Sequence, residues 1–110
     1  MTRTGLSITR PPAGAGVTLA LQGEIDMSNV EEMESALHRA LAESTGSVVL
    51  DLSGVTFCDS LGFSTMIKFW RVAGAAGCEF VVARPGPTVR RILDMMGISS
   101  VIRVVDEIPA

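Results

Sequence analysis

The sequence has few of the residues from which small catalytic and metal-binding sites are usually built. Its 110 residues include two cysteines, one histidine, one tryptophan and no tyrosine. A metal site needs several ligands, and the lone histidine, His38, falls on or beside the polar face of an expected helix. We therefore expect His38 to be a surface residue, and we expect no metal site.

Several catalytic motifs are also missing. There is no G-x-x-x-x-G-K-[ST] phosphate loop and no C-x-x-C pair, and the G-x-G at residues 14–16 lacks a third glycine. A serine–histidine pair would need His38, which belongs to a different expected helix from Ser60. Cys58 has no basic neighbour in sequence that would lower its pKa. The sequence therefore predicts a protein that is not an enzyme and needs no cofactor of its own.

Long hydrophobic runs and clusters of basic residues are absent as well. No run reaches 18 apolar residues, which predicts no membrane insertion. The net charge of −3, from 12 acidic and 9 basic residues, gives no basic surface for nucleic acid. The first residues do not lead into an apolar signal segment, so we expect a cytoplasmic protein with both cysteines reduced.

The composition that is present favours one folded domain. Hydrophobic residues make up 47% of the chain and charged residues 19%. A chain of this length can form one substantial core. We expect a single domain over residues 1–110, with residues 1–5 and 106–110 as flexible ends.

Apolar patterning predicts the strands of an α/β fold. Residues 6–9 and 17–21 alternate in polarity around a Pro- and Gly-rich segment, which indicates an antiparallel hairpin. Residues 48–52 are apolar and rich in β-branched side chains, as in a strand buried on both faces. We expect Ser53 and Gly54 to end this strand in a turn. Residues 78–83 and 101–105 supply two more strands.

Three helical segments lie between these strands. A capping box formed by Ser28 and Glu31 begins the first, which ends near residues 44–46. Thr88 is expected to cap the third, which ends at Gly97 and turns four apolar residues inward: Val89, Ile92, Leu93 and Met96. The order β-β-α-β-α-β-α-β predicts a mainly parallel mixed sheet with an N-terminal antiparallel hairpin and helices packed on it.

The second helix follows the central strand and is unusually apolar. One face carries Phe63, Met66, Ile67, Trp70 and Ala73. Such a face belongs either to the core or in part to a partner. Asp59 and Ser60 stand directly before it, where side-chain oxygens accept the free N–H groups of a helix.

Two roles are open for Asp59 and Ser60. The two residues can serve only as a helix cap. Alternatively, phosphorylation of Ser60 would add about −1.5 to −2 charges. A helix N-terminus tolerates such charge while the protein surface changes, so Ser60 can act as a binding switch.

Three segments in order, residues 21–26, 49–62 and 89–98, resemble the STAS domain family, and in particular bacterial anti-sigma factor antagonists. The segments read Leu-Gln-Gly-Glu-Ile-Asp, then the central strand through Asp59, Ser60 and Gly62, then the closing helix. The resemblance covers nearly the whole chain.

The resemblance implies a function in transcription. In that family the unphosphorylated antagonist, or anti-anti-sigma factor, binds an anti-sigma factor that is also a serine kinase, and so frees a sigma factor. The kinase then phosphorylates a serine, and a phosphatase restores the first state. ATP and magnesium would belong to the kinase.

Site residues carry over by position. Ser60 matches the phosphorylated serine, Asp59 the preceding aspartate, and Asp26 an aspartate with a supporting role. The implied partner-binding set is Asp26, Asp59, Ser60, Leu61, Gly62 and Phe63.

Two departures from the family pattern leave alternatives open. Leu61 stands where the family commonly has serine or threonine, and Phe63 and Ser64 stand where it often has leucine and glycine. One alternative is a non-switching STAS scaffold subunit of a stress-signalling or lipid-transport complex. Another is a small hydrolase or transferase that uses Ser60 or Cys58. The sequence leaves the oligomeric state open.

Overall fold

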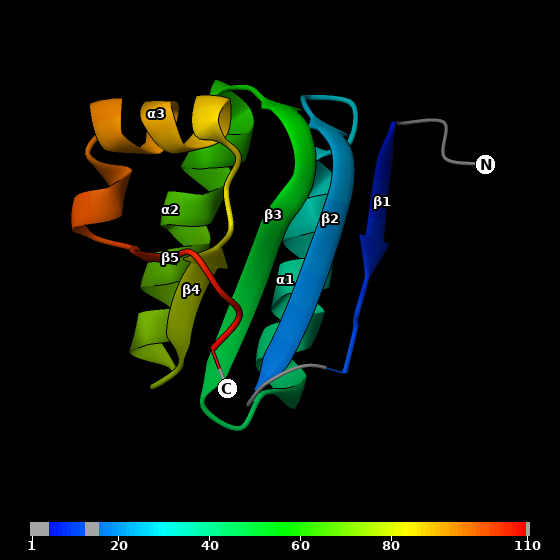
Figure 1. Ribbon diagram of the computed structural model, residues 1–110. Helices are drawn as coiled ribbons and strands as arrows, with labels where there is room; N and C mark the ends of the chain where they lie inside the picture. The colour runs from blue at the N-terminus through cyan, green and yellow to red at the C-terminus, as the bar shows by residue number, and fades with distance from the viewer. Residues whose placement is uncertain (1–4, 13–15, 110) are drawn as a thin grey trace.

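The chain folds into one mixed sheet with helices packed against it (Figure 1). The computed structural model describes residues 5–12 and 16–109. In chain order the elements are β1 (Leu6–Thr9), β2 (Val17–Ile25), α1 (Val30–Glu43), β3 (Ser47–Cys58), α2 (Ser60–Ala75), β4 (Glu79–Ala83), α3 (Pro87–Met95), the 3₁₀ helix η1 (Ile98–Ser100) and β5 (Arg103–Val105).

The five strands lie side by side in sequence order, from β1 to β5. β1 pairs with β2 antiparallel, and every later pair is parallel. The predicted α/β class and the N-terminal hairpin are therefore confirmed. The hairpin loop includes residues 13–15, which lie outside the described residues.

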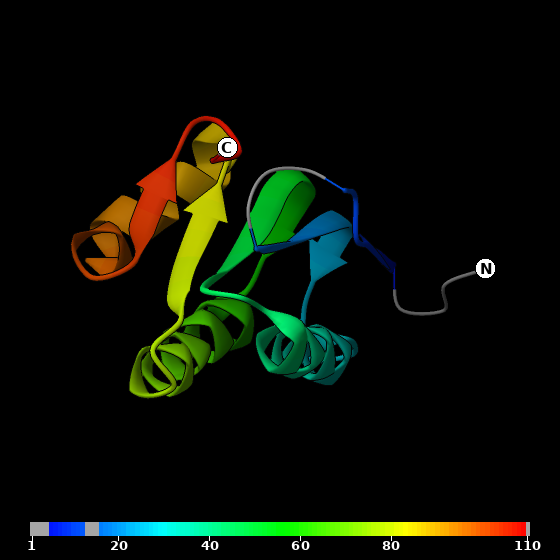
Figure 2. The ribbon, with the colours of Figure 1, turned by 90° about the horizontal axis from the view of Figure 1, so that it is seen from below.

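The helices α1 and α2 lie together on one face of the sheet (Figure 2). The main core fills the space between them and the strands, where Val48, Leu50 and Leu52 of β3 are fully buried. α3 lies beside the end of β3 (Figure 1). Alternation along β3 follows from the side-chain period of two in a strand, and sends Val49 to a smaller apolar cluster on the opposite face.

The C-terminal segment completes that smaller cluster. Ile108 and Val105 pack against Val49, Val81 and Ala83. Of the ends expected to be flexible, residues 1–4 and 110 lie outside the described residues.

The predicted turn at Ser53 and Gly54 is wrong. β3 continues without a break to Cys58. The pairing with β2 instead shifts register, from Ala20 opposite Asp51 to Gln22 opposite Gly54. A Cβ at Gly54 would lie 2.9 Å from the Leu21 carbonyl oxygen, so the glycine permits a close approach at an irregularity of the sheet.

Two predicted features of the C-terminal third are also wrong. α3 begins at Pro87 with Gly86 as its N-cap, so Thr88 lies inside the helix. Proline suits the first helical position because the N–H it lacks would have no partner there. Met96 is 51% exposed and lies outside the core. The left-handed Gly97, with φ of 74°, is confirmed as the residue that ends α3.

The last strand is shorter than expected. Residues 98–100 form η1, and β5 covers only Arg103–Val105. Ile102 is nevertheless buried. The apolar residues that suggested a strand over residues 101–105 therefore include one that packs in the core without being part of a strand.

The apolar face of α2 was expected to belong either to the core or in part to a partner, and the structure shows both a buried part and an accessible part. Phe63, Met66 and Phe69 are buried in the core. Ile67 and Trp70 are only partly buried against that core. α2 therefore has one core face and a second apolar strip that is still accessible.

A buried carboxylate ties β3 to the residue after β4. The Asp51 side chain is 5% exposed and accepts a hydrogen bond from Arg84 Nη2 at 2.5 Å. Arg84 has a φ of 53°, which is uncommon for a residue with a side chain. Its backbone N–H donates to the Val105 carbonyl at 2.8 Å. Through its side chain and its backbone N–H, Arg84 thus links the end of β4 to both β3 and β5.

Because of this ion pair, we expect the free energy of unfolding to depend on pH in the acid range. Burial raises the pKa of Asp51, but the hydrogen bonds from Arg84 and Ser53 and the charge of Arg84 outweigh it, and the pKa is lowered. A lowered folded-state pKa gives stability above the unfolded pKa of about 3.9, and that stability is lost as the pH falls below it.

We therefore expect the free energy of unfolding to fall less steeply for Asp51→Asn than for wild type between about pH 4 and about pH 2. Urea unfolding at several pH values would measure both slopes. Equal slopes for the two proteins would contradict the assignment.

Candidate functional site

The candidate site forms where the neighbouring strands β2 and β3 end. Ile25 and Cys58 are the last paired residues of these strands, and Asp26 and Asp59 follow them directly. The Asp59 N–H donates to the Ile25 carbonyl at 3.0 Å, which joins the two strand ends. The two loops that carry Asp26 and Ser60 therefore lie next to each other, at the carboxyl edge of the sheet.

Asp59 is the N-cap of α2, as predicted. Its Oδ1 accepts a hydrogen bond from the Gly62 N–H at 3.1 Å. Its carbonyl oxygen accepts from the N–H groups of Gly62 and Phe63. These bonds fix the first turn of α2 and so fix the position of Ser60.

Ser60 is the first residue of α2 and its side chain is exposed. Its hydroxyl makes no hydrogen bond to any of the described residues. The first N–H groups of a helix have no partner within that helix, and they carry the positive end of its dipole. An accessible hydroxyl therefore stands beside an environment that favours negative charge.

A hydrogen-bonded loop holds Asp26 in place. Asp26 Oδ1 accepts from the Ser28 N–H at 2.9 Å and from the Ser28 hydroxyl at 2.6 Å. Asn29, which is buried, accepts from the Asp26 N–H at 3.0 Å and donates to the Glu24 carbonyl at 2.8 Å. The loop between β2 and α1 is thus fixed at both ends.

The predicted capping box is therefore wrong. Asn29 is the N-cap of α1, without a side-chain cap bond, and the Ser28 hydroxyl donates to Asp26. Because the helix begins one residue later than expected, Ser28 precedes the N-cap position from which a side chain reaches the first free N–H groups. Asn29 was missed at the sequence level, although asparagine close to aspartate is typical of a tight turn.

The six predicted partner-binding residues differ in how far they are exposed to solvent. Ser60 and Leu61 are exposed, and Asp26 and Asp59 are half-buried. Gly62 and Phe63 are buried beneath them. A direct partner contact by each of the six residues stays a prediction.

Gly62 lets α2 approach the strand ends closely. A Cβ at this position would lie 2.5 Å from Cys58 Sγ and 2.8 Å from Ile25 Cγ2. Only glycine avoids these contacts with the ends of β3 and β2. The glycine in the site segment thus has a packing role that is independent of any partner.

Three exposed apolar side chains lie close in sequence to the site residues. Met27, Phe57 and Leu61 are 77%, 49% and 46% exposed. Met27 directly follows Asp26, Leu61 directly follows Ser60, and Phe57 lies two residues before Asp59. Met27 and Phe57 are not in the predicted partner-binding set, although an apolar residue in an expected loop, such as Met27, indicates a candidate contact surface.

The alternative of a cysteine nucleophile loses its chemical basis here. Burial, with a contribution from the charge of Asp59, raises the pKa of the Cys58 thiol to about 12. A thiol with this pKa remains protonated near neutral pH and is a poor nucleophile. Cys58 and Cys78 are both free and buried.

His38 is an exposed residue of α1, and its ring lies nearly perpendicular to that of Phe69, with the two ring centroids 5.7 Å apart. Within residues 5–12 and 16–109, no three His, Cys, Asp or Glu side chains are grouped to hold a metal ion. In the same ranges, no helix is long and apolar enough to span a bilayer.

The sequence matches the STAS domain family over residues 8–109, and the chain belongs to that family. It is 28% identical over 99 residues to the anti-sigma-F factor antagonist RsfB of Mycobacterium tuberculosis, covering 90% of this chain and 80% of the relative.

Two solved structures share the fold. An anti-sigma factor antagonist from Mycobacterium paratuberculosis has a TM-score of 0.85 at 23% identity, covering 97% of this chain and 91% of that one. The Bacillus cell fate determinant SpoIIAA, in its phosphorylated form, has a TM-score of 0.69 at 19% identity, covering 92% and 93%.

The role of Gly62 can be tested against a second glycine of α2. We expect Gly62→Ala to destabilise the protein by about 1–3 kcal/mol, because the added methyl group overpacks the strand ends. Gly74→Ala is the matched control: no atom lies within 4 Å of its Cβ position. It should be neutral or stabilise by up to about 1 kcal/mol. Urea unfolding measures both, and an equal effect of the two variants would contradict the packing role.

Proposed function

We propose that this chain is an anti-sigma factor antagonist that is switched by phosphorylation of Ser60. In its unphosphorylated form it binds an anti-sigma factor that is also a serine kinase, and a sigma factor is released for transcription. The observation that supports this most is the accessible Ser60 hydroxyl at the start of α2, with exposed apolar side chains around it. The proposal implies a cytoplasmic protein and a serine phosphatase that reverses the switch.

The surface around Ser60 has the character of a protein-binding surface. Phe57 and Leu61 leave about half of their surface in water, and Met27 leaves more. Burying such side chains against a partner is favourable at roughly 25 cal/mol per Å² of apolar area. A neutral hydroxyl among them is easily accommodated when it finds a hydrogen-bond partner.

Phosphorylation would change this surface without changing the fold. The kinase transfers the γ-phosphoryl group of ATP to Ser60 Oγ, the hydroxyl proton is lost and ADP leaves. The product carries about −1.5 to −2 charges beside Asp26 and Asp59. The start of α2 accommodates this charge, whereas a partner surface would have to desolvate it, which is costly. The switch therefore acts on binding.

One observation favours a second candidate, a STAS scaffold that does not switch. Leu61 is exposed at a position where the family commonly has serine or threonine. In such a scaffold, for example a subunit of a stress-signalling or lipid-transport complex, apolar contacts alone would hold the partner. Ser60→Ala and Ser60→Asp would then bind as wild type does.

For the switch, we expect Ser60→Asp to weaken binding to the anti-sigma partner at least about tenfold, a change of about 1.4 kcal/mol. The free energy of unfolding should stay within about 1 kcal/mol of wild type, since the new charge lies at a helix N-terminus. Calorimetric titration and thermal melting would measure the two quantities. Thr45→Asp, on the exposed loop before β3, adds the same charge at the opposite end of that strand and is the matched control.

The covalent step needs its own experiment. The purified chain would be incubated with ATP, magnesium and candidate anti-sigma kinases, then examined by intact mass and peptide mapping. One phosphate on Ser60, absent in Ser60→Ala, is the expected result. Stable binding to a kinase with no phosphate gained, together with normal binding by Ser60→Asp, would exclude the switch and favour the scaffold.

A further inference from the structure

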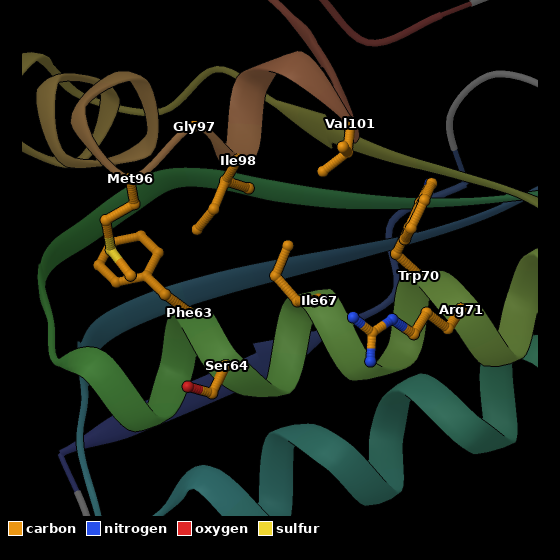
Figure 3. A pocket seen from close by; sticks show the side chains of 9 residues that line it. All are labelled: Phe63, Ser64, Ile67, Trp70, Arg71, Met96, Gly97, Ile98 and Val101. Carbon is orange, nitrogen blue, oxygen red and sulfur yellow. The ribbon is translucent and has the colours of Figure 1, made fainter.

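A groove of about 420 Å³ lies between α2 and the segment that follows α3 (Figure 3). Phe63, Ile67 and Trp70 line it from α2, and Met96, Ile98 and Val101 line it from the other side. It begins one helical turn beyond Ser60. It shares Phe63 with the predicted partner-binding set, but none of Asp26, Asp59 and Ser60 lines it.

The groove has a buried apolar floor and accessible walls. Phe63 and Ile98 are buried, whereas Met96 and Val101 remain about half exposed. In Figure 3, Ile67 and Trp70 rise from α2 toward Ile98 and Val101. Pockets that bind small molecules are mostly apolar and have volumes of about 300–1,000 Å³, and this groove falls in that range.

The polar groups of the groove favour an anion. Arg71 is the only charged residue that lines it, and no aspartate or glutamate does. Arg71 forms no ion pair with any residue in the described part of the chain. Figure 3 shows Arg71 and Ser64 along one side of α2, outside the apolar interior. A guanidinium at the rim matches a carboxylate, which it can bind through two parallel hydrogen bonds.

From this arrangement we infer that the groove binds a small organic acid with an apolar body, such as an aromatic carboxylic acid. The body lies against Ile67, Trp70 and Ile98, and the carboxylate pairs with Arg71. The inference goes beyond the proposed function and does not depend on phosphorylation or on a protein partner.

The chain contains its own reporter for this site, because Trp70 is its only tryptophan. Three probes share one apolar body and differ in charge: phenylbutyrate, phenylbutanol and phenylbutylamine. Each would be titrated into the purified chain while the Trp70 fluorescence and the heat of binding are recorded. We expect saturable one-to-one binding of the acid, and binding of the alcohol and the amine weaker by about fivefold or more.

Arg71→Gln isolates the charge contribution. This variant should reduce binding of phenylbutyrate to the level of phenylbutanol and leave phenylbutanol binding unchanged. Arg39→Gln is the matched control, since Arg39 is also exposed but lies on α1 and does not line the groove. Thermal melting would show that both variants are folded.

Three outcomes would overturn the inference: no saturable change with phenylbutyrate, equal binding of all three probes, or an Arg71→Gln variant that binds the acid as wild type does. A protein partner that shields Trp70 while no acid binds would likewise overturn it and assign the groove to protein docking. Because the titration uses this chain alone, its failure would leave the Ser60 switch untouched.

Discussion

The junction between the ends of β2 and β3 and the start of α2 is the constraint on which the rest of the site depends. Asp59 donates its N–H to Ile25 and accepts the Gly62 N–H, so one residue ends a strand, joins it to its neighbour and begins a helix. Gly62 lets the helix lie directly on the strand ends. Ser60 is held at the surface because the residues on either side of it are fixed.

This rigidity is suited to a surface that changes chemically. Asp26 is held by Ser28, and its loop by Asn29, so neither loop at the site needs to move when charge is added at Ser60. In the proposed switch, the N-terminal end of α2 would receive the charge, and a partner bound to the exposed side chains of Met27, Phe57 and Leu61 would meet it. A switch of this kind needs no second conformation of the protein.

α2 is shared by three environments. Its buried face holds the core through Met66 and Phe69, its first residue carries the candidate switch, and its third side lines the groove through Ile67, Trp70 and Arg71. The Asp51–Arg84 pair supports this arrangement from the far face of the sheet, where it fixes β4 and the segment leading to α3. The groove therefore has one wall on α2 and the other on the segment between α3 and β5.

The sequence by itself determined the features that depend on neighbouring residues. The order of strands and helices, the antiparallel hairpin, Asp59 as the cap of α2 and the left-handed Gly97 all follow from local patterns of polarity and backbone preference. Contacts between distant segments were decided only by the tertiary structure. Gly54 resembled a turn residue in the sequence. The structure shows that a glycine is needed there because β2, which is distant in sequence, approaches its backbone closely. Three further features depend in the same way on which segments the sheet brings together. They are the exposure of Met27 and Phe57, the pairing of Asp51 with Arg84, and the groove beside Trp70.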